Sequence, residues 1–168
     1  MTLSIPLPNF LLSNKNMLTQ HLMRDVEEIF DTMVGLGDLL HIPVQIDPVT
    51  NFKDSISSLV GLAGACNGLV SLHMPSTLAF RATGNMLGME VAELNDDVND
   101  AMGEIANMIA GSFKMHLSKS GLDINLSTPS VVHGKEYMIT LGTNPDQIAV
   151  RFATDEDWFM VAVAFDRD

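Results

Sequence analysis

The stretch DDVNDAMGEIANMIAGSFKMHL, residues 96–117, decides how this chain of 168 residues folds. Its apolar residues recur every three or four positions, which is typical of an amphipathic α-helix. At about 100° per residue they form one broad stripe that faces a core. This stripe comprises Val98, Met102, Ile105, Ile109, Phe113 and Leu117. The stretch therefore predicts a long helix over residues 97–117, stopped by Gly121.

A second stripe lies on roughly the opposite side of the predicted helix. It comprises Asp100, Glu104, Asn107, Gly111 and Lys114. Glu104 and Asn107 are three positions apart, so helical geometry places their Cβ atoms about 5–6 Å from each other. A carboxylate pairs with a cation, and an amide both donates and accepts hydrogen bonds, so it can orient a water molecule. The pair suits a hydrolysis that needs a positioned water, although an ordinary solvated helix face has the same spacing.

Gly111 is unusual because a glycine inside a helix costs about 1 kcal/mol relative to alanine. Two explanations are open at this point. The missing side chain lets another surface come close, which is a functional role, or it allows tight packing inside the same molecule.

The rest of the chain predicts an α+β fold, an antiparallel sheet with the long helices packed on one face. A helix is expected over residues 16–36 and a shorter one over 77–87, closed by Gly88. The apolar stripe of the first comprises Leu18, Leu22, Val26, Ile29, Met33 and Leu36. Strands are expected at residues 42–46, 55–62, 68–73, 123–127, 136–141, 147–154 and 158–165.

Residues 28–35 and 104–111 share the pattern E-I-x-[D/N]-x-x-x-G. This weak echo predicts two related halves packed about a pseudo-two-fold axis. Four matched positions also arise by chance, so the echo alone does not decide the point.

Composition restricts the class of function. The net charge is −12 and the sequence contains no run of Lys or Arg, which argues against binding nucleic acid or an anionic membrane. A single cysteine, Cys66, excludes an internal disulfide. The five histidines lack metal-ligand spacing, and NDDVND fails the calcium-loop pattern, so no metal is expected.

No apolar run is long enough to span a membrane, and the start of the chain does not have the pattern of a secretory signal. We therefore expect a cytoplasmic protein. Residues 1–14 are expected to form an irregular arm, and residues 15–168 a single domain.

The segment DAMGEIANMIAG, residues 100–111, resembles the signature helix of the CheC/CheX/FliY group of chemotaxis phosphatases. The motif of that group is Asp or Ser, then Glu, then Asn, and a later proline. The matching positions here are Asp100, Glu104, Asn107 and Pro129. The first helix, with VEEIFDTMVG at residues 26–35, is similar to the corresponding helix of CheX-like members, so the resemblance extends over nearly the whole chain after residue 14.

The resemblance implies a phosphatase that hydrolyses the aspartyl phosphate of a response regulator, a CheY-like receiver. Asn107 would place the attacking water in line with the phosphorus, and Glu104 would dock against a lysine of the receiver. Asp100, Gly111, Lys114 and Pro129 would lie at the partner interface. The receiver would supply the phosphoaspartate and its Mg²⁺, so this chain is expected to bind no cofactor. Catalysis would then proceed by positioning.

The first helix departs from the motif, with Asp31 in place of Asn and Arg24 in place of the leading acid. One active site is therefore expected, rather than two. The resemblance also implies a homodimer formed through the sheet or its edge strands. Two alternatives remain, a non-catalytic module of the same fold that binds a response regulator, and a structural dimerisation domain. The presence of Asn107 favours the enzyme, because neither alternative needs a water-positioning amide.

Overall fold

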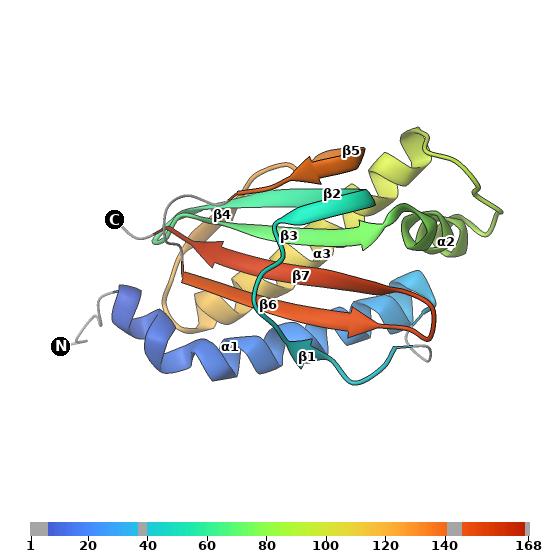
Figure 1. The fold of residues 1–168 in the computed structure, drawn as a ribbon. Coiled ribbons are helices and arrows are strands. Elements are labelled where there is room, and N and C mark those ends of the chain that lie inside the picture. Colours follow the sequence, from blue (N-terminus) through green and yellow to red (C-terminus); the bar gives the residue numbers. More distant parts are fainter. Residues whose placement is uncertain (1–6, 37–39, 141–145, 167–168) are drawn as a thin grey trace.

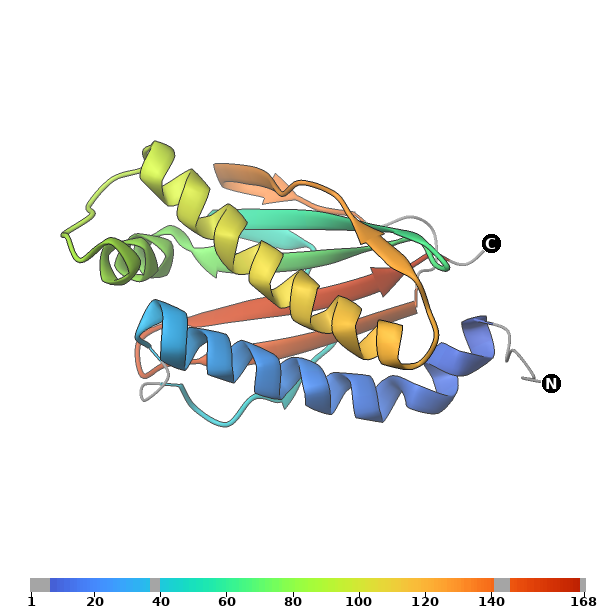
Figure 2. The same cartoon turned by 180° about the vertical axis from the view of Figure 1, so that it is seen from behind.

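The computed structural model describes residues 7–36, 40–140 and 146–166, with side chains of the first helix from residue 13 onward. Within these ranges the chain forms one sheet of seven strands, all paired antiparallel, and the long helices α1 and α3 lie across one face of it (Figures 1 and 2). The α+β class and the placement of the long helices on one face are as predicted. The pseudo-two-fold repeat stays a prediction.

The helices are α1 (Leu7–Ile29), its π-helical continuation η1 (Phe30–Val34), α2 (Ser76–Leu87) and α3 (Asp96–Lys119). The strands are β1 (Val44–Gln45), β2 (Asn51–Gly64), β3 (Gly68–Pro75), β4 (Ile124–Leu126), β5 (Ser130–Met138), β6 (Asp146–Ala153) and β7 (Trp158–Phe165). The strand order is β1-β6-β7-β3-β2-β4, and β5 pairs with the same edge of β2 as β4, along the preceding part of that strand. None of the described helices is long and apolar enough to cross a membrane.

The main core lies between the sheet and the helices. All six residues of the apolar stripe predicted for α3 are fully buried there. Burying side chains of this size contributes about 1.5–3 kcal/mol each. The stripe therefore anchors α3 firmly to the sheet and fixes which of its faces points to solvent.

The first helix differs from the prediction at both ends. It begins at Leu7, so residues 7–14 are helical instead of irregular, and residues 1–6 lie outside the described residues. Pro8 does not prevent this start, because the first helical turn has backbone N–H groups without intrahelical partners anyway.

The other end of this helix carries a change of helical period. The chain is π-helical over Phe30–Val34 before Gly35 caps it with φ 71°. A π turn holds one residue more than an α turn. The apolar stripe therefore shifts by one position, so that Met33 is 53% exposed and Val34 is buried instead. The prediction that Met33 belongs to the core was wrong for this reason.

The predicted strand at 136–141 was also misplaced. The observed strand β5 begins at Ser130, and its ladder with β2 runs from Asn51↔Met138 to Leu59↔Ser130. Most β5 residues are exposed or half-buried, because it is an outer strand of the sheet. A strand exposed in this way lacks the alternation that sequence patterns detect. Residue 141 falls outside the described residues.

Candidate functional site

Helix α3 carries the predicted site, and its start is fixed by local chemistry. The side-chain Oδ1 of Asn95, the N-cap, accepts a hydrogen bond from the backbone N–H of Val98 at 3.0 Å. Asp96 and Asp97 occupy the first turn, where the helix dipole favours negative charge. The helix therefore has a defined register, and its core stripe fixes its rotation.

The predicted stripe is on the surface of the molecule. Asp100, Glu104 and Asn107 are exposed, and Gly111 and Lys114 are half-buried. No hydrogen bond or ion pair to another described residue holds the side chains of Glu104 and Asn107. A rigid helix thus presents an acid and an amide, three residues apart, with their polar groups available to a partner.

The surroundings of Gly111 test one of the two explanations that the sequence left open for this glycine, which is tight packing inside the molecule. A Cβ built on this glycine meets no described atom within 4 Å. Tight packing against the described part of the molecule therefore does not explain the glycine. The close approach of another surface at Gly111 stays a prediction.

Pro129 lies beside this stripe, in the connection between β4 and β5. A Cβ built on Gly103 would lie 3.2 Å from Pro129 Cγ, so the absence of a side chain at Gly103 allows the proline to pack against α3. Asn107 is one turn after Gly103, and side chains on a helix lean toward its N-terminus. Pro129 therefore packs on the flank toward which Asn107 leans. Sequence reasoning missed Gly103, and the only signal was a second glycine inside a predicted helix.

A cluster of titratable groups ties α3 to α1 on the other flank. His116 Nε2 lies 2.7 Å from Asp25 Oδ2, and the rings of His116 and His21 stack with centroids 4.0 Å apart. Burial, and next the neighbouring His116, lower the pKa of His21. This contact was also missed. The available signal was the spacing of His21 and Asp25, which puts both on one side of α1.

The described residues contain no group of three His, Cys, Asp or Glu side chains that could hold a metal ion. The α3 stripe itself offers the carboxylates of Asp100 and Glu104, the amide of Asn107 and the ammonium group of Lys114. Such a surface can orient water and dock a cation, but it has no nucleophile of its own.

The chain was compared with known proteins. The family described as "Chemotaxis phosphatase CheX" matches residues 56–153. A relative from Thermotoga maritima, the CheY-P phosphatase CheX, is 30% identical over 119 residues, which are 70% of this chain and 76% of the relative.

Solved structures show the same fold. The chemotaxis protein CheX from Vibrio vulnificus is 28% identical with a TM-score of 0.77, over 89% of this chain and 99% of that one. A putative chemotaxis protein from Desulfovibrio vulgaris Hildenborough is 27% identical with a TM-score of 0.76, over 89% of this chain and 97% of that one.

A more distant structure is the CheX-CheY-BeF3-Mg+2 complex from Borrelia burgdorferi, which is 18% identical to this chain. Its TM-score is 0.72 over 88% of this chain and 97% of that one, and it supports the fold. The family match includes the whole of α3 and Pro129 and extends from β2 to the end of β6. The chain therefore belongs to the CheX family of chemotaxis phosphatases.

Proposed function

We propose that this protein hydrolyses the aspartyl phosphate of a CheY-like response regulator in the cytoplasm. Membership of the CheX family and the similarity to a CheY-P phosphatase support this activity. The observation that carries the proposal is the exposed pair of Glu104 and Asn107 on α3, whose side chains no described residue engages.

Asn107 would act by orienting the nucleophile. Its Oδ1 accepts a hydrogen bond from a water molecule, which directs the water's lone pair at the phosphorus. The water oxygen forms a bond to phosphorus as the bond to the aspartate oxygen breaks. The products are a free aspartate side chain on the receiver and inorganic phosphate, which keeps the protons of the water. An amide is a poor base, so the rate would come from alignment instead of proton abstraction.

The receiver would supply the phosphoryl group and a Mg²⁺ ion. When bound there, Mg²⁺ neutralises charge on the phosphoryl oxygens. The Borrelia complex, named for CheX, CheY, BeF3 and Mg²⁺, is the basis for extending this expectation to the present chain.

Docking would use the remaining residues of the α3 stripe. The Glu104 carboxylate pairs with a lysine of the receiver, and Asp100 adds negative charge one turn earlier. Gly111 lets the receiver surface come close to the helix, because nothing projects from that position. Lys114 and Pro129 border the contact on its flank.

We further propose that the protein is a homodimer joined through an edge of its sheet. Support comes from β5, which pairs with β2 on one side and with no described strand on the other. The unpaired N–H and C=O groups of such an edge are available to a second chain. Val132 and Met138 on this strand are 39% and 63% exposed, although both are apolar. Sedimentation of the whole protein measures its mass in solution, and the proposal expects twice the mass of one chain.

The decisive experiment follows the decay of a receiver charged with a small acyl phosphate, with and without this protein. We expect faster decay with the wild type. Asn107→Ala should lose about 10²–10³-fold of the acceleration, which is the range for removing one orienting group at a reacting centre. Glu104→Ala should raise the concentration of protein required. Asn125→Ala and Glu136→Ala, exposed and outside α3, serve as matched controls.

Full activity of Asn107→Ala would refute the assigned role. If the wild type leaves decay unchanged for every receiver of the source organism but still retains a receiver in a pull-down, the non-catalytic binding module is correct. Unchanged decay without retention favours the structural domain.

A further inference from the structure

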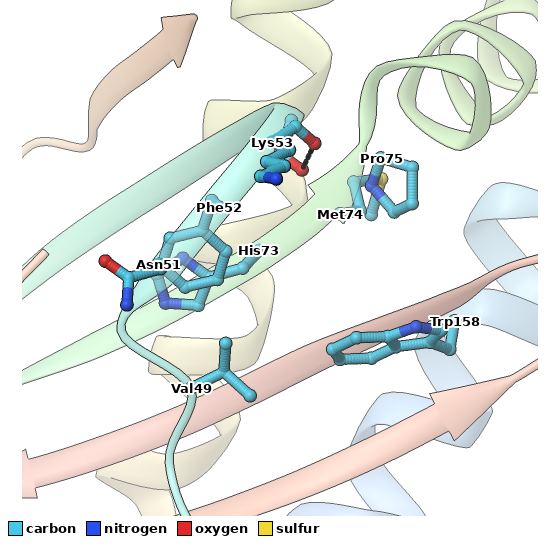
Figure 3. A pocket seen from close by; sticks show the side chains of 9 residues that line it. Val49, Asn51, Phe52, Lys53, His73, Met74, Pro75 and Trp158 are labelled. Carbon is cyan, nitrogen blue, oxygen red and sulfur yellow. Dashed lines mark hydrogen bonds between the residues drawn. The ribbon is translucent and has the colours of Figure 1, made fainter. Parts of the chain in front are cut away.

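A cavity lies on the sheet face opposite the long helices, lined mainly by residues of β2, β3 and β7 (Figure 3). Its volume is about 330 Å³, near the lower end of the range for sites that hold small organic molecules. The residues that shape it include Phe52, Lys53, His73, Pro75 and Trp158. Three of the lining side chains, Phe52, His73 and Trp158, carry flat aromatic rings. Lys53 is the one charged side chain among the described residues that line the cavity.

The cavity lies at the end of the β3–β7 ladder. This ladder runs from Gly68↔Phe165 to His73↔Met160 and stops before Pro75 and Trp158. Proline has no N–H to continue such a ladder. The side chain of Trp158 therefore borders a gap in the sheet and is 43% exposed (Figure 3).

A strained residue shapes the opposite wall. Asp54 has φ 45° and is the one described non-glycine residue with positive φ. The β2–β5 ladder omits it, passing from Lys53↔Glu136 to Ser55↔Gly134. Phe52 consequently packs in the outer cluster, although simple alternation would put it with Ile56 in the main core. Backbone strain of this kind gathers at ligand sites, and here it turns Phe52 onto His73, with ring centroids 4.3 Å apart.

His73 is part of a buried polar relay. Ser57 Oγ lies 2.7 Å from the Tyr137 hydroxyl and 2.6 Å from His73 Nδ1. Burial lowers the pKa of His73 to about 4, so the ring is neutral near pH 7, and burial raises the pKa of Tyr137, which stays protonated.

The relay can run in two directions with these partners. When Tyr137 donates to Ser57 and Ser57 donates to Nδ1, both hydroxyl protons are used and Nε2 carries the ring proton. In the reverse direction His73 Nδ1–H donates to Ser57, Ser57 donates to Tyr137, and the half-buried Tyr137 hydroxyl donates to solvent. In the first direction His73 Nε2–H is a donor that makes no hydrogen bond to a described residue, and the proposal below uses this tautomer.

We propose that this cavity binds a small planar organic anion, an aromatic or heteroaromatic carboxylate. The ring lies against Trp158 and Pro75, and the carboxylate accepts the Nε2–H of His73 and pairs with the Lys53 ammonium. Both polar groups select for a negatively charged acceptor, in a chain whose net charge is −12. The flat aromatic walls select for a planar ring.

Trp158 is the only tryptophan of the sequence, so its fluorescence reports on the cavity without labelling. The whole protein is titrated with three probes: benzoate, the neutral planar benzamide and the non-planar anion cyclohexanecarboxylate. Benzoate should change the emission of Trp158 with saturation. The other two probes should bind at least about tenfold more weakly, because each lacks one of the two selected features.

Two variants separate binding from folding. Lys53→Gln should weaken benzoate about threefold, the size expected for a partly exposed ion pair, and should leave benzamide unchanged. Lys135→Gln, an exposed lysine on β5 that does not line the cavity, is the matched control and should behave as the wild type.

Three outcomes would overturn the proposal. The first is that benzoate causes no saturable change in the emission of Trp158, and the second is that all three probes bind equally well. The third is that the emission changes with the concentration of the protein and does not respond to any probe. The last result would mean that a second copy of the chain covers the cavity. None of these measurements uses a receiver, so their failure is distinct from a failure of the phosphatase proposal.

Discussion

The substitution Gly111→Ala tests the proposed docking surface most sharply, because it should move stability and activity in opposite directions. Gly111 lies inside α3 in the exposed stripe, and a Cβ there meets no described atom within 4 Å. The folded chain should therefore accept alanine without strain, whereas a closely docked receiver should not.

The expected magnitudes follow from this geometry. Replacing glycine by alanine inside a helix stabilises it by about 1 kcal/mol, and contacts with the described residues add no steric cost that would offset this gain. For a chain of this size that gain raises Tm by about 2–4 °C. At a tightly packed interface an added methyl group costs about 1–3 kcal/mol. The affinity for the phosphorylated receiver should fall by roughly 5- to 150-fold.

Thermal unfolding followed by circular dichroism gives the first quantity, and receiver dephosphorylation at increasing protein concentration gives the second. Gly88→Ala is a matched control for stability. Gly88 also has open space around it, but its φ is 67°, so alanine there should destabilise the fold by about 1 kcal/mol. A lower Tm for Gly111→Ala would reveal an internal contact at Gly111, and unchanged activity would show that no surface comes close to it.

Three further predictions concern the rest of the molecule. The buried hydroxyl of Ser58 has no hydrogen-bond partner among the described residues, so Ser58→Ala should stabilise the protein by about 1 kcal/mol in denaturant unfolding, and a loss of stability would reveal an unseen partner. Burial lowers the pKa of His73 from its ordinary value of 6.5 to about 4 in the folded protein, so the unfolded chain binds more protons between these two pH values. The contribution of His73 to the free energy of unfolding is therefore fully present above pH 6.5, and it should fall by up to about 3 kcal/mol as the pH is lowered toward 4. In His73→Gln the free energy of unfolding should change less with pH over this range. Burial raises the pKa of the Cys66 thiol to about 11, so a thiol reagent at pH 8 should react with the unfolded chain and leave the native protein largely unmodified; rapid native labelling would contradict this.

The sequence predicted the helical framework well where a strong amphipathic period exists. In α3 the core stripe and the exposed stripe were both correct, because each turn of an α-helix repeats the same geometry. The C-terminal strand Trp158–Phe165 was also correct, since a continuous apolar run between turns has few other interpretations.

The failures have a common physical cause, which is tertiary context without a local pattern. The regular α-helical period of the sequence gives no sign of the π turn after Ile29, so the exposure of Met33 was not predictable from that period alone. The extent of β5 depends on the long strand β2 that it pairs with. Gly103 and Pro129 are far apart in sequence, and their contact becomes visible only when the fold brings them together.

The π turn over Phe30–Val34 is one reason to expect a single active site instead of two. Glu28 and Asp31 of α1 are exposed like Glu104 and Asn107 of α3, so exposure does not distinguish the two helices. The side-chain chemistry and the helical geometry do distinguish the two helices. A carboxylate at Asp31 repels a phosphoryl group and has no N–H to donate. Asp31 also lies within the π-helical segment, where residues three apart no longer keep the spacing they have in an α-helix. Restoring the amide by Asp31→Asn should therefore create no second site, because the altered helical turn would still misdirect it.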